Sequence, residues 1–281
     1  MIVMVDHRGL ALQMFHRRRD ASKVALAHLV AREGVPVLIH GVLCDHSVWV
    51  LQSRYLAHHG WNVLAIDLPG HARSQGPAAA SVEEAADQIH AMLDAAGLDR
   101  VALVGHSWGS LIALEAAARL KQRTTHLALI GAAFPMPVAA PLLEASLADT
   151  DKAIAMINVF SRATLAAPPS AMGPGTWVHG ASTALNRRIL ASNRGVNLLH
   201  RGFTACDTYD QGLQAMANLT CPVLFINGAL DQMTPPKTTQ ALIEQGQQTG
   251  KKIHVATVPM GHHHMNESPE ETLQALRQFL R

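Results

Sequence analysis

Short apolar runs recur along this chain, and segments with helical periodicity separate them. Continuous apolar runs of this length are typical of strands buried on both faces, and the helices between them supply the crossovers of a parallel sheet. The alternation therefore predicts an α/β fold with a mostly parallel sheet flanked by helices. The runs are VPVLIH (35–40), WNVLAID (61–67), VALVG (101–105), HLALIG (126–131), PVLFING (222–228) and KIHVATVP (252–259).

Two parts of the chain do not follow this alternation of apolar runs and helical segments. Near the N-terminus, apolar residues alternate in 23–33, which predicts a half-buried strand paired with an earlier strand at 10–16. Between about 135 and 219 the strand runs stop and helix-like segments follow, and an insertion of that length is better explained as a helical cap than as a loop. We therefore predict a core from 1–134 and 220–281 and a cap from 135–219.

The composition indicates a soluble globular protein. The 281 residues are 48% hydrophobic and 16% charged, with 23 basic and 21 acidic residues and no long basic stripe, so neither nucleic acid nor an anionic membrane is an expected partner. The uncharged stretch 127–143 contains three prolines, which favours a strand and a loop over a membrane helix.

Cysteine usage and the N-terminal sequence favour a cytoplasmic location. The three cysteines are widely spaced and lack metal-ligand spacing, so no disulfide framework is expected. Charged residues interrupt the first apolar stretch before a signal-peptide core is formed. The sequence is equally compatible with a monomer and with a homodimer.

Gly105-His106-Ser107-Trp108-Gly109 stands where an apolar run ends and a helical pattern begins. A serine flanked by glycines at a strand-to-helix turn is the setting of a nucleophile elbow, because glycine allows a sharp turn and close packing of helix on strand. The motif alone is weak, and a helix-capping serine at an ordinary turn is the alternative.

A serine hydroxyl is a poor nucleophile near neutral pH, so it needs a base and a group that orients the base. Asp231 and His262 each follow one of the last two apolar runs. Because the carboxyl ends of neighbouring parallel strands meet at one rim of a sheet, Ser107, Asp231 and His262 are predicted to form a catalytic triad.

Each triad assignment has an alternative. A turn-capping role is the alternative for Asp231. His263 and His264 adjoin the predicted base, and we expect both to be its partly exposed neighbours. Adjacent histidines do not easily share one ligand sphere, so no metal is predicted. The sequence also has no nucleotide fingerprint or phosphate loop, and no cofactor is expected.

Further residues are assigned around the triad. The backbone N–H groups of Val42 and Trp108 are the candidates for an oxyanion hole, which stabilises the charge of a tetrahedral intermediate. Structural or packing roles are expected for His40, Cys44, Asp67, Arg73 and His106. The candidates for lining an apolar substrate pocket are Trp108, Met156, Met172, Trp177 and Phe203.

The chain from about residue 24 to 281 resembles the α/β-hydrolase superfamily. The motifs that carry the resemblance are His40-Gly41 with Trp49, DLPGHARS (67–74), the elbow at 105–109, Asp231, and GHHHMNESPE (261–270). The resemblance implies a mostly parallel eight-stranded α/β-hydrolase sheet with a helical cap inserted after strand 6. Ala72 departs from the pattern, because that loop usually has glycine there and alanine tolerates positive φ poorly.

These observations predict a serine hydrolase that cleaves a small, largely apolar carboxylic ester or related acyl compound through an acyl-enzyme. The same triad is also compatible with C–C bond hydrolysis, thioester cleavage, release of an N-terminal proline or peracid formation. A ligand receptor without catalytic activity on the same fold is the alternative from another class.

Overall fold

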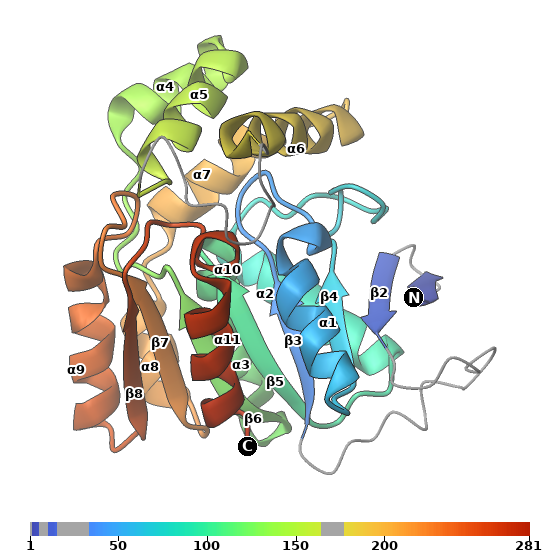
Figure 1. Cartoon of the computed structure of the whole chain (residues 1–281). Coiled ribbons are helices and arrows are strands. Elements are labelled where there is room, and N and C mark those ends of the chain that lie inside the picture. The colour runs from blue at the N-terminus through green and yellow to red at the C-terminus, as the bar shows by residue number, and fades with distance from the viewer. Residues whose placement is uncertain (1, 6–10, 16–33, 164–176) are drawn as a thin grey trace.

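A computed structural model describes residues 2–5, 11–15, 34–163 and 177–281. Through the middle of the molecule runs one eight-stranded sheet, with the strand order β1-β2-β4-β3-β5-β6-β7-β8 (Figure 1). The six strands β3 to β8 are parallel, and β1 and β2 pair antiparallel at one edge. The strands are β1 (Ile2–Val5), β2 (Ala11–Phe15), β3 (Val35–Ile39), β4 (Val63–Ile66), β5 (Val101–His106), β6 (Thr124–Ile130), β7 (Val223–Gly228) and β8 (Ile253–Val258).

The mostly parallel α/β sheet is confirmed, and each of the six apolar runs overlaps one of its parallel strands. The prediction of burial on both faces is wrong for β8, where Val255 is 52% exposed, because β8 is an edge strand with a neighbour on one side only. The predicted strand at 10–16 is β2, but its predicted pairing partner is wrong, because β1 and β4 occupy both of its edges. The segment 23–33 lies outside the described residues.

Helices cover both faces of the sheet (Figure 1). On one face α2, α3, α8 and α9 pack in sequence against one another, and α1, α10 and α11 contact one another on the other face. These helices are α1 (Val50–His58), α2 (Val82–Ala95), α3 (Trp108–Leu120), α8 (Gly212–Asn218), α9 (Gln240–Gln248), α10 (His264–Glu267) and α11 (Pro269–Phe279), with short 3-10 helices at η2 (His46–Trp49), η3 (Lys121–Arg123) and η4 (Pro236–Thr239). Each face thus has its own buried apolar layer.

Four helices between β6 and β7 gather beyond one end of the sheet (Figure 1). We call them the roof helices: α4 (Ala140–Ala148), α5 (Thr150–Phe160), α6 (Val178–Ser192) and α7 (Leu198–Thr208). They share a hydrophobic cluster that also includes Leu43 and Ala78, so they are packed onto the loops that follow β3 and β4. No helix in the described ranges is both long and apolar enough to cross a membrane. Instead, the uncharged stretch 127–143 forms the end of β6, a loop and the start of α4.

Candidate active site

Ser107 lies in a strained turn between β5 and α3. Its φ of 54° and ψ of −123° are rare for a residue with a side chain, and such a conformation costs about 1–3 kcal/mol. The surrounding backbone holds it there, because the Ser107 N–H donates to the carbonyl of Ile130 (2.9 Å) and the Ser107 carbonyl accepts from the Ser110 N–H (2.8 Å). The turn leaves Ser107 half-buried at the carboxyl end of the sheet.

The two glycines of the motif are required by close backbone approach. A Cβ on Gly105 would lie 2.0 Å from the carbonyl oxygen of Gly109, and a Cβ on Gly109 would lie 2.5 Å from the carbonyl oxygens of Ile39 and His40. Neither distance is possible for real atoms. Helix α3 can therefore start directly beside β3 and β5 only because both positions lack a side chain.

Asp231 and His262 form a buried hydrogen-bonded pair. The imidazole Nδ1 of His262 donates to Oδ2 of Asp231 at 2.8 Å, although the residues belong to loops that follow different strands. Asp231 also caps its own turn, since its Oδ1 accepts the N–H groups of Met233 (2.9 Å) and Thr234 (2.8 Å). The turn-capping alternative and the orienting role are thus fulfilled by the two oxygens of the same carboxylate.

Burial alone would raise the pKa of Asp231, but the adjacent His262 and the donors of Thr234 hold this pKa well below its usual value. Thr234 is a site residue that the sequence analysis missed. Its hydroxyl donates to Oδ2 of Asp231 (2.8 Å) and lies 3.1 Å from Nδ1 of His262. The Asp-x-x-Thr spacing typical of a side-chain-capped turn was a signal that could have identified it.

The other two histidines of the run are buried, so the expectation that they are partly exposed is wrong. His263 is 9% exposed and His264 is fully buried. His264 Nδ1 donates to the carbonyl of His262 (2.7 Å), and His106 Nε2 donates to the same oxygen (2.8 Å). Burial lowers the pKa of His264 to about 4 and the pKa values of His106 and His263 well below their usual value. All three imidazoles are therefore neutral near pH 7.

Ser107 and His262 line one cavity of about 370 Å³ beneath the roof helices. The other lining residues are almost entirely apolar, and no lysine, arginine, aspartate or glutamate is among those described. The lining residues are Val42, Ser107, Met136, Pro137, Val138, Ala139, Leu142, Met156, Phe160, Phe203, Cys206, Gln232, Met233, Thr234 and His262.

Of the residues expected to line the pocket, Met156 and Phe203 do so. Trp108 does not, because as the first residue of α3 it packs into the apolar layer between the helices and the sheet. Trp177, which precedes α6, is 75% exposed and also lies outside the cavity lining. Met172 lies outside the described residues.

Several residues have the structural roles that were expected. The buried imidazole of His40 donates from Nδ1 to the carbonyl of Gly41 (2.8 Å) and accepts the Leu68 N–H at Nε2 (3.1 Å), which fixes it as a neutral linker between two loops. Cys44 is buried, and burial raises the pKa of its thiol to about 12. Ala72 has a φ of 47° and thus adopts the conformation for which glycine is usual.

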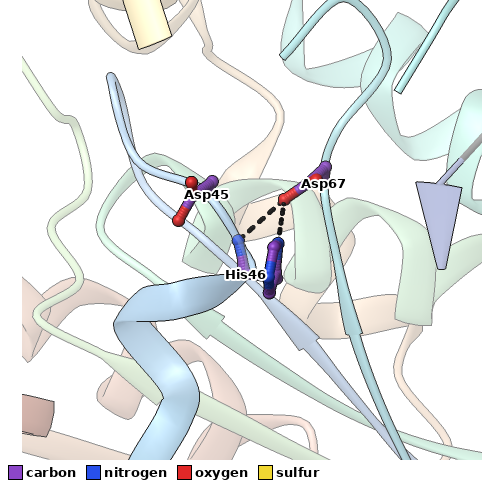
Figure 2. A group of neighbouring side chains, drawn as sticks. All are labelled: Asp45, His46 and Asp67. Carbon is purple, nitrogen blue, oxygen red and sulfur yellow. Dashed lines mark hydrogen bonds and ion pairs between the residues drawn. The ribbon is translucent and has the colours of Figure 1, made fainter. Parts of the chain in front are cut away.

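Asp45, His46 and Asp67 bring three potential metal-ligand atoms within 4.8 Å of one another (Figure 2). Oδ1 of Asp67 accepts both the backbone N–H (2.8 Å) and the Nδ1 proton (2.7 Å) of His46. The Asp45 carboxylate accepts the Ser47 N–H (2.9 Å) and an Arg188 N–H (2.9 Å). These hydrogen bonds account for the grouping as a structural link between the loops after β3 and β4.

Comparison with known proteins identifies the family of this chain. The sequence matches the family model for the alpha/beta hydrolase fold over residues 37–268, and the chain belongs to the α/β-hydrolase family. An esterase from Exiguobacterium antarcticum has a similar structure, with a TM-score of 0.77, 17% identity, and coverage of 99% of this chain and 98% of that chain. At this identity the likeness shows the fold alone.

Two curated relatives match part of the sequence. (E)-2-((N-methylformamido)methylene)succinate hydrolase of Acinetobacter baylyi is 40% identical over 82 residues, which are 28% of this chain and 31% of that enzyme. 2-Succinyl-6-hydroxy-2,4-cyclohexadiene-1-carboxylate synthase of Serratia proteamaculans is 39% identical over 79 residues, 28% of this chain and 30% of the enzyme. The chain thus matches less than a third of the length of each of these relatives.

Proposed function

We propose that the protein is a serine hydrolase in which Ser107 is the nucleophile, His262 the general base and Asp231 the group that orients the base. The observation that carries this proposal is the 2.8 Å Asp231–His262 pair, whose imidazole lines the same cavity as the strained Ser107. With Nδ1 donating to Asp231, the neutral ring has its free lone pair on Nε2, which is the form that can accept a hydroxyl proton. Water then hydrolyses the acyl-enzyme.

The oxyanion of the tetrahedral intermediate needs donors close to Ser107. The Trp108 N–H is the first of α3, and the first N–H groups of a helix have no partner within the helix. Val42 lines the cavity beside Ser107 and follows Gly41, whose missing Cβ would stand 3.1 Å from the Ser107 Cβ. We assign the oxyanion hole to the N–H groups of these two residues.

The substrate we propose is a small, uncharged ester with a largely apolar acyl or alcohol group. The names of both curated relatives describe carboxylates, succinate for one and a cyclohexadiene carboxylate for the other. A carboxylate that enters a cavity without a cationic side chain loses its hydration with no compensating partner, which is costly. The described lining offers no such cation, and the sequence of 164–176 contains none. The roof helices, within the segment 135–219, would act as the cap over this substrate.

A fluorophosphonate probe tests the nucleophile. We expect the wild-type chain to be labelled and Ser107→Ala to be unlabelled, whereas Ser192→Ala, which removes an exposed serine at the end of α6, should be labelled like the wild type. Ester hydrolysis should be lost with the labelling. An intact wild-type protein that is not labelled between about pH 7 and 8 would favour the receptor alternative.

Matched esters test the charge of the substrate. We expect p-nitrophenyl butyrate to be hydrolysed with a kcat/KM at least about tenfold above that of p-nitrophenyl hemisuccinate, since the second compound carries a carboxylate into an apolar cavity. Their rates of spontaneous hydrolysis provide the correction for intrinsic reactivity. Equal kcat/KM values would refute the proposed preference for uncharged acyl groups.

A further inference from the structure

Glu267 is a buried carboxylate that the triad does not use. It lies at the end of α10, is 6% exposed, and directs both oxygens at backbone N–H groups. Oε1 accepts from His263 (3.3 Å), and Oε2 accepts from Gly261 (3.4 Å) and from Ala163 (3.0 Å). One side chain therefore holds the backbone N–H groups of the two residues that flank His262, Gly261 and His263.

The main chain of His262 itself is held from two further directions. Its N–H donates to the carbonyl of Ser161 at 2.8 Å, and its carbonyl accepts the imidazole protons of His106 and His264. Ser161 and Ala163 directly follow the roof helix α5. The loop that carries the proposed base is thus hydrogen-bonded to a segment about a hundred residues earlier in the chain.

Arg162 provides the positive charge in this segment. Its side chain is buried, its Nη1 lies 4.0 Å from Oε1 of Glu267, and its Nη2 donates to the hydroxyl of Ser182 on α6 at 2.5 Å. A buried ion pair adds little net stability, because the loss of hydration offsets the attraction, but removal of one partner leaves the other charge buried without compensation. Here the contacts run from α6 through Arg162 and Glu267 to the backbone around His262.

The fit between the two segments depends on Gly261. A Cβ at this position would lie 2.6 Å from the backbone nitrogen of Ala163 and 2.9 Å from the carbonyl oxygen of Ser161. Glycine therefore allows the histidine loop to lie directly against the chain that leaves α5. Oε2 of Glu267 accepts the N–H groups of both residues of this close approach, Gly261 and Ala163.

From these contacts we infer that Glu267 is a positioning residue for His262, with Arg162 as its counter-charge, and that the base is fully ordered only while the segment 161–163 is seated against its loop. The inference rests on the proposed serine-hydrolase function. Glu267 touches neither Asp231 nor Ser107 in the contacts described above, so it acts through the backbone of His262. A displacement of the imidazole by about 1 Å is sufficient to lower a rate by about a hundredfold.

Glu267→Gln tests the inference, because the amide keeps the shape but turns an NH₂ group toward N–H donors. We expect kcat for p-nitrophenyl butyrate to fall about tenfold or more with KM within about twofold, well below the melting temperature of the variant. In ¹H NMR, the downfield imidazole proton shared by His262 and Asp231 should broaden or shift. A purely structural role would lower the melting temperature and leave both the kcat of the folded fraction and this resonance unchanged.

Glu115→Gln is the matched control. Glu115 is another buried carboxylate, which accepts from Arg119 (2.8 Å) and from the Tyr209 hydroxyl (2.7 Å) on the face of the sheet that α3 covers. This variant should lose stability but keep the wild-type kcat and resonance.

Each result bears on one claim. A folded Glu267→Gln variant with the kcat and downfield resonance of the wild type overturns the positioning role while leaving the hydrolase intact. An unlabelled, inactive wild type instead overturns the proposed function itself. If Glu267→Gln does not fold, Arg162→Met undergoes the same assays: a fall in kcat with a changed resonance supports the inference, and wild-type values of both overturn the role of Arg162 as the counter-charge that holds Glu267 in place.

Discussion

Replacement of Asp231 by asparagine should disable the proposed base through its tautomer. Oδ1 of Asp231 accepts two backbone N–H groups, from Met233 and Thr234, and this pair of donors selects the oxygen of an asparagine amide for that side. The NH₂ group must then occupy the place of Oδ2, 2.8 Å from Nδ1 of His262. Facing a donor, the imidazole is stable only with its proton on Nε2, and in that form it cannot accept the hydroxyl proton of Ser107.

The expected loss in kcat is large. A triad whose orienting aspartate is replaced by asparagine loses about 10⁴ in kcat through this change of tautomer, and we expect about 10³–10⁴ here. The assay is hydrolysis of p-nitrophenyl butyrate at pH 7–8, with circular dichroism and thermal melting to show that the variant is folded. Asp231→Glu is the companion variant, since it keeps the charge but lengthens the side chain. A folded Asp231→Asn enzyme within about tenfold of wild-type kcat would refute the tautomer argument.

Three further predictions concern stability. Gly105→Ala should cost more than about 4 kcal/mol or prevent folding, because its Cβ would stand 2.0 Å from the Gly109 carbonyl; a melting temperature close to that of the wild type would contradict this. Ala72→Gly should stabilise the protein by about 0.5 kcal/mol in urea unfolding, since relief of the left-handed strain of about 1 kcal/mol exceeds the added entropy of the unfolded chain, and a destabilised variant would show that the strain is smaller than this entropy and the packing of the Ala72 methyl group together. Acid should destabilise the fold steeply between about pH 6.5 and 4, because histidines that are buried neutral take up protons on unfolding and each adds up to about 1.4 kcal/mol per pH unit. The stability linked to these groups is fully present above their unfolded pKa near 6.5 and is lost as the pH falls toward their folded values, about 4 for His264 and about 3 for His71. Unfolding free energies measured between pH 4 and 7 that do not change would contradict the neutral burial of these histidines, which also include His40, His106 and His263.

The sheet could be predicted from the sequence because a strand buried on both faces appears as a continuous apolar run. A strand covered on both sides must be continuously apolar, and five of the six runs do form interior strands. The run that becomes β8 contains Lys252, His254 and Thr257 and lies at the edge of the sheet. Strand order itself depends on the path of the crossovers, which no single run specifies.

The pairing of Asp231 with His262 could be predicted for the same reason. Each residue stands one short turn beyond one of the last two apolar runs, and the parallel arrangement of β7 and β8 brings both turns to one rim. The direction of a side chain at the start of a helix cannot be predicted from the neighbouring sequence in this way. Trp108 follows the proposed nucleophile directly, yet its side chain is buried in the apolar layer between the helices and the sheet, with its ring 5.9 Å from that of His71, and it does not line the cavity.

The burial of His263 and His264 could not be predicted from the local sequence. Nothing in the sequence around residues 262–264 indicates that the second and third imidazoles are buried, because their burial depends on β5 and on the segment after α5, which lie far away in the sequence. Once buried, a histidine must be neutral and needs an acceptor for its single N–H, and the nearest acceptor common to His106 and His264 is the carbonyl of His262. Hence the same burial that makes the fold sensitive to acid also fixes the backbone of the proposed base. Acid should therefore weaken folding and the placement of the base together, since protonation of either imidazole favours the departure of its ring from this interior.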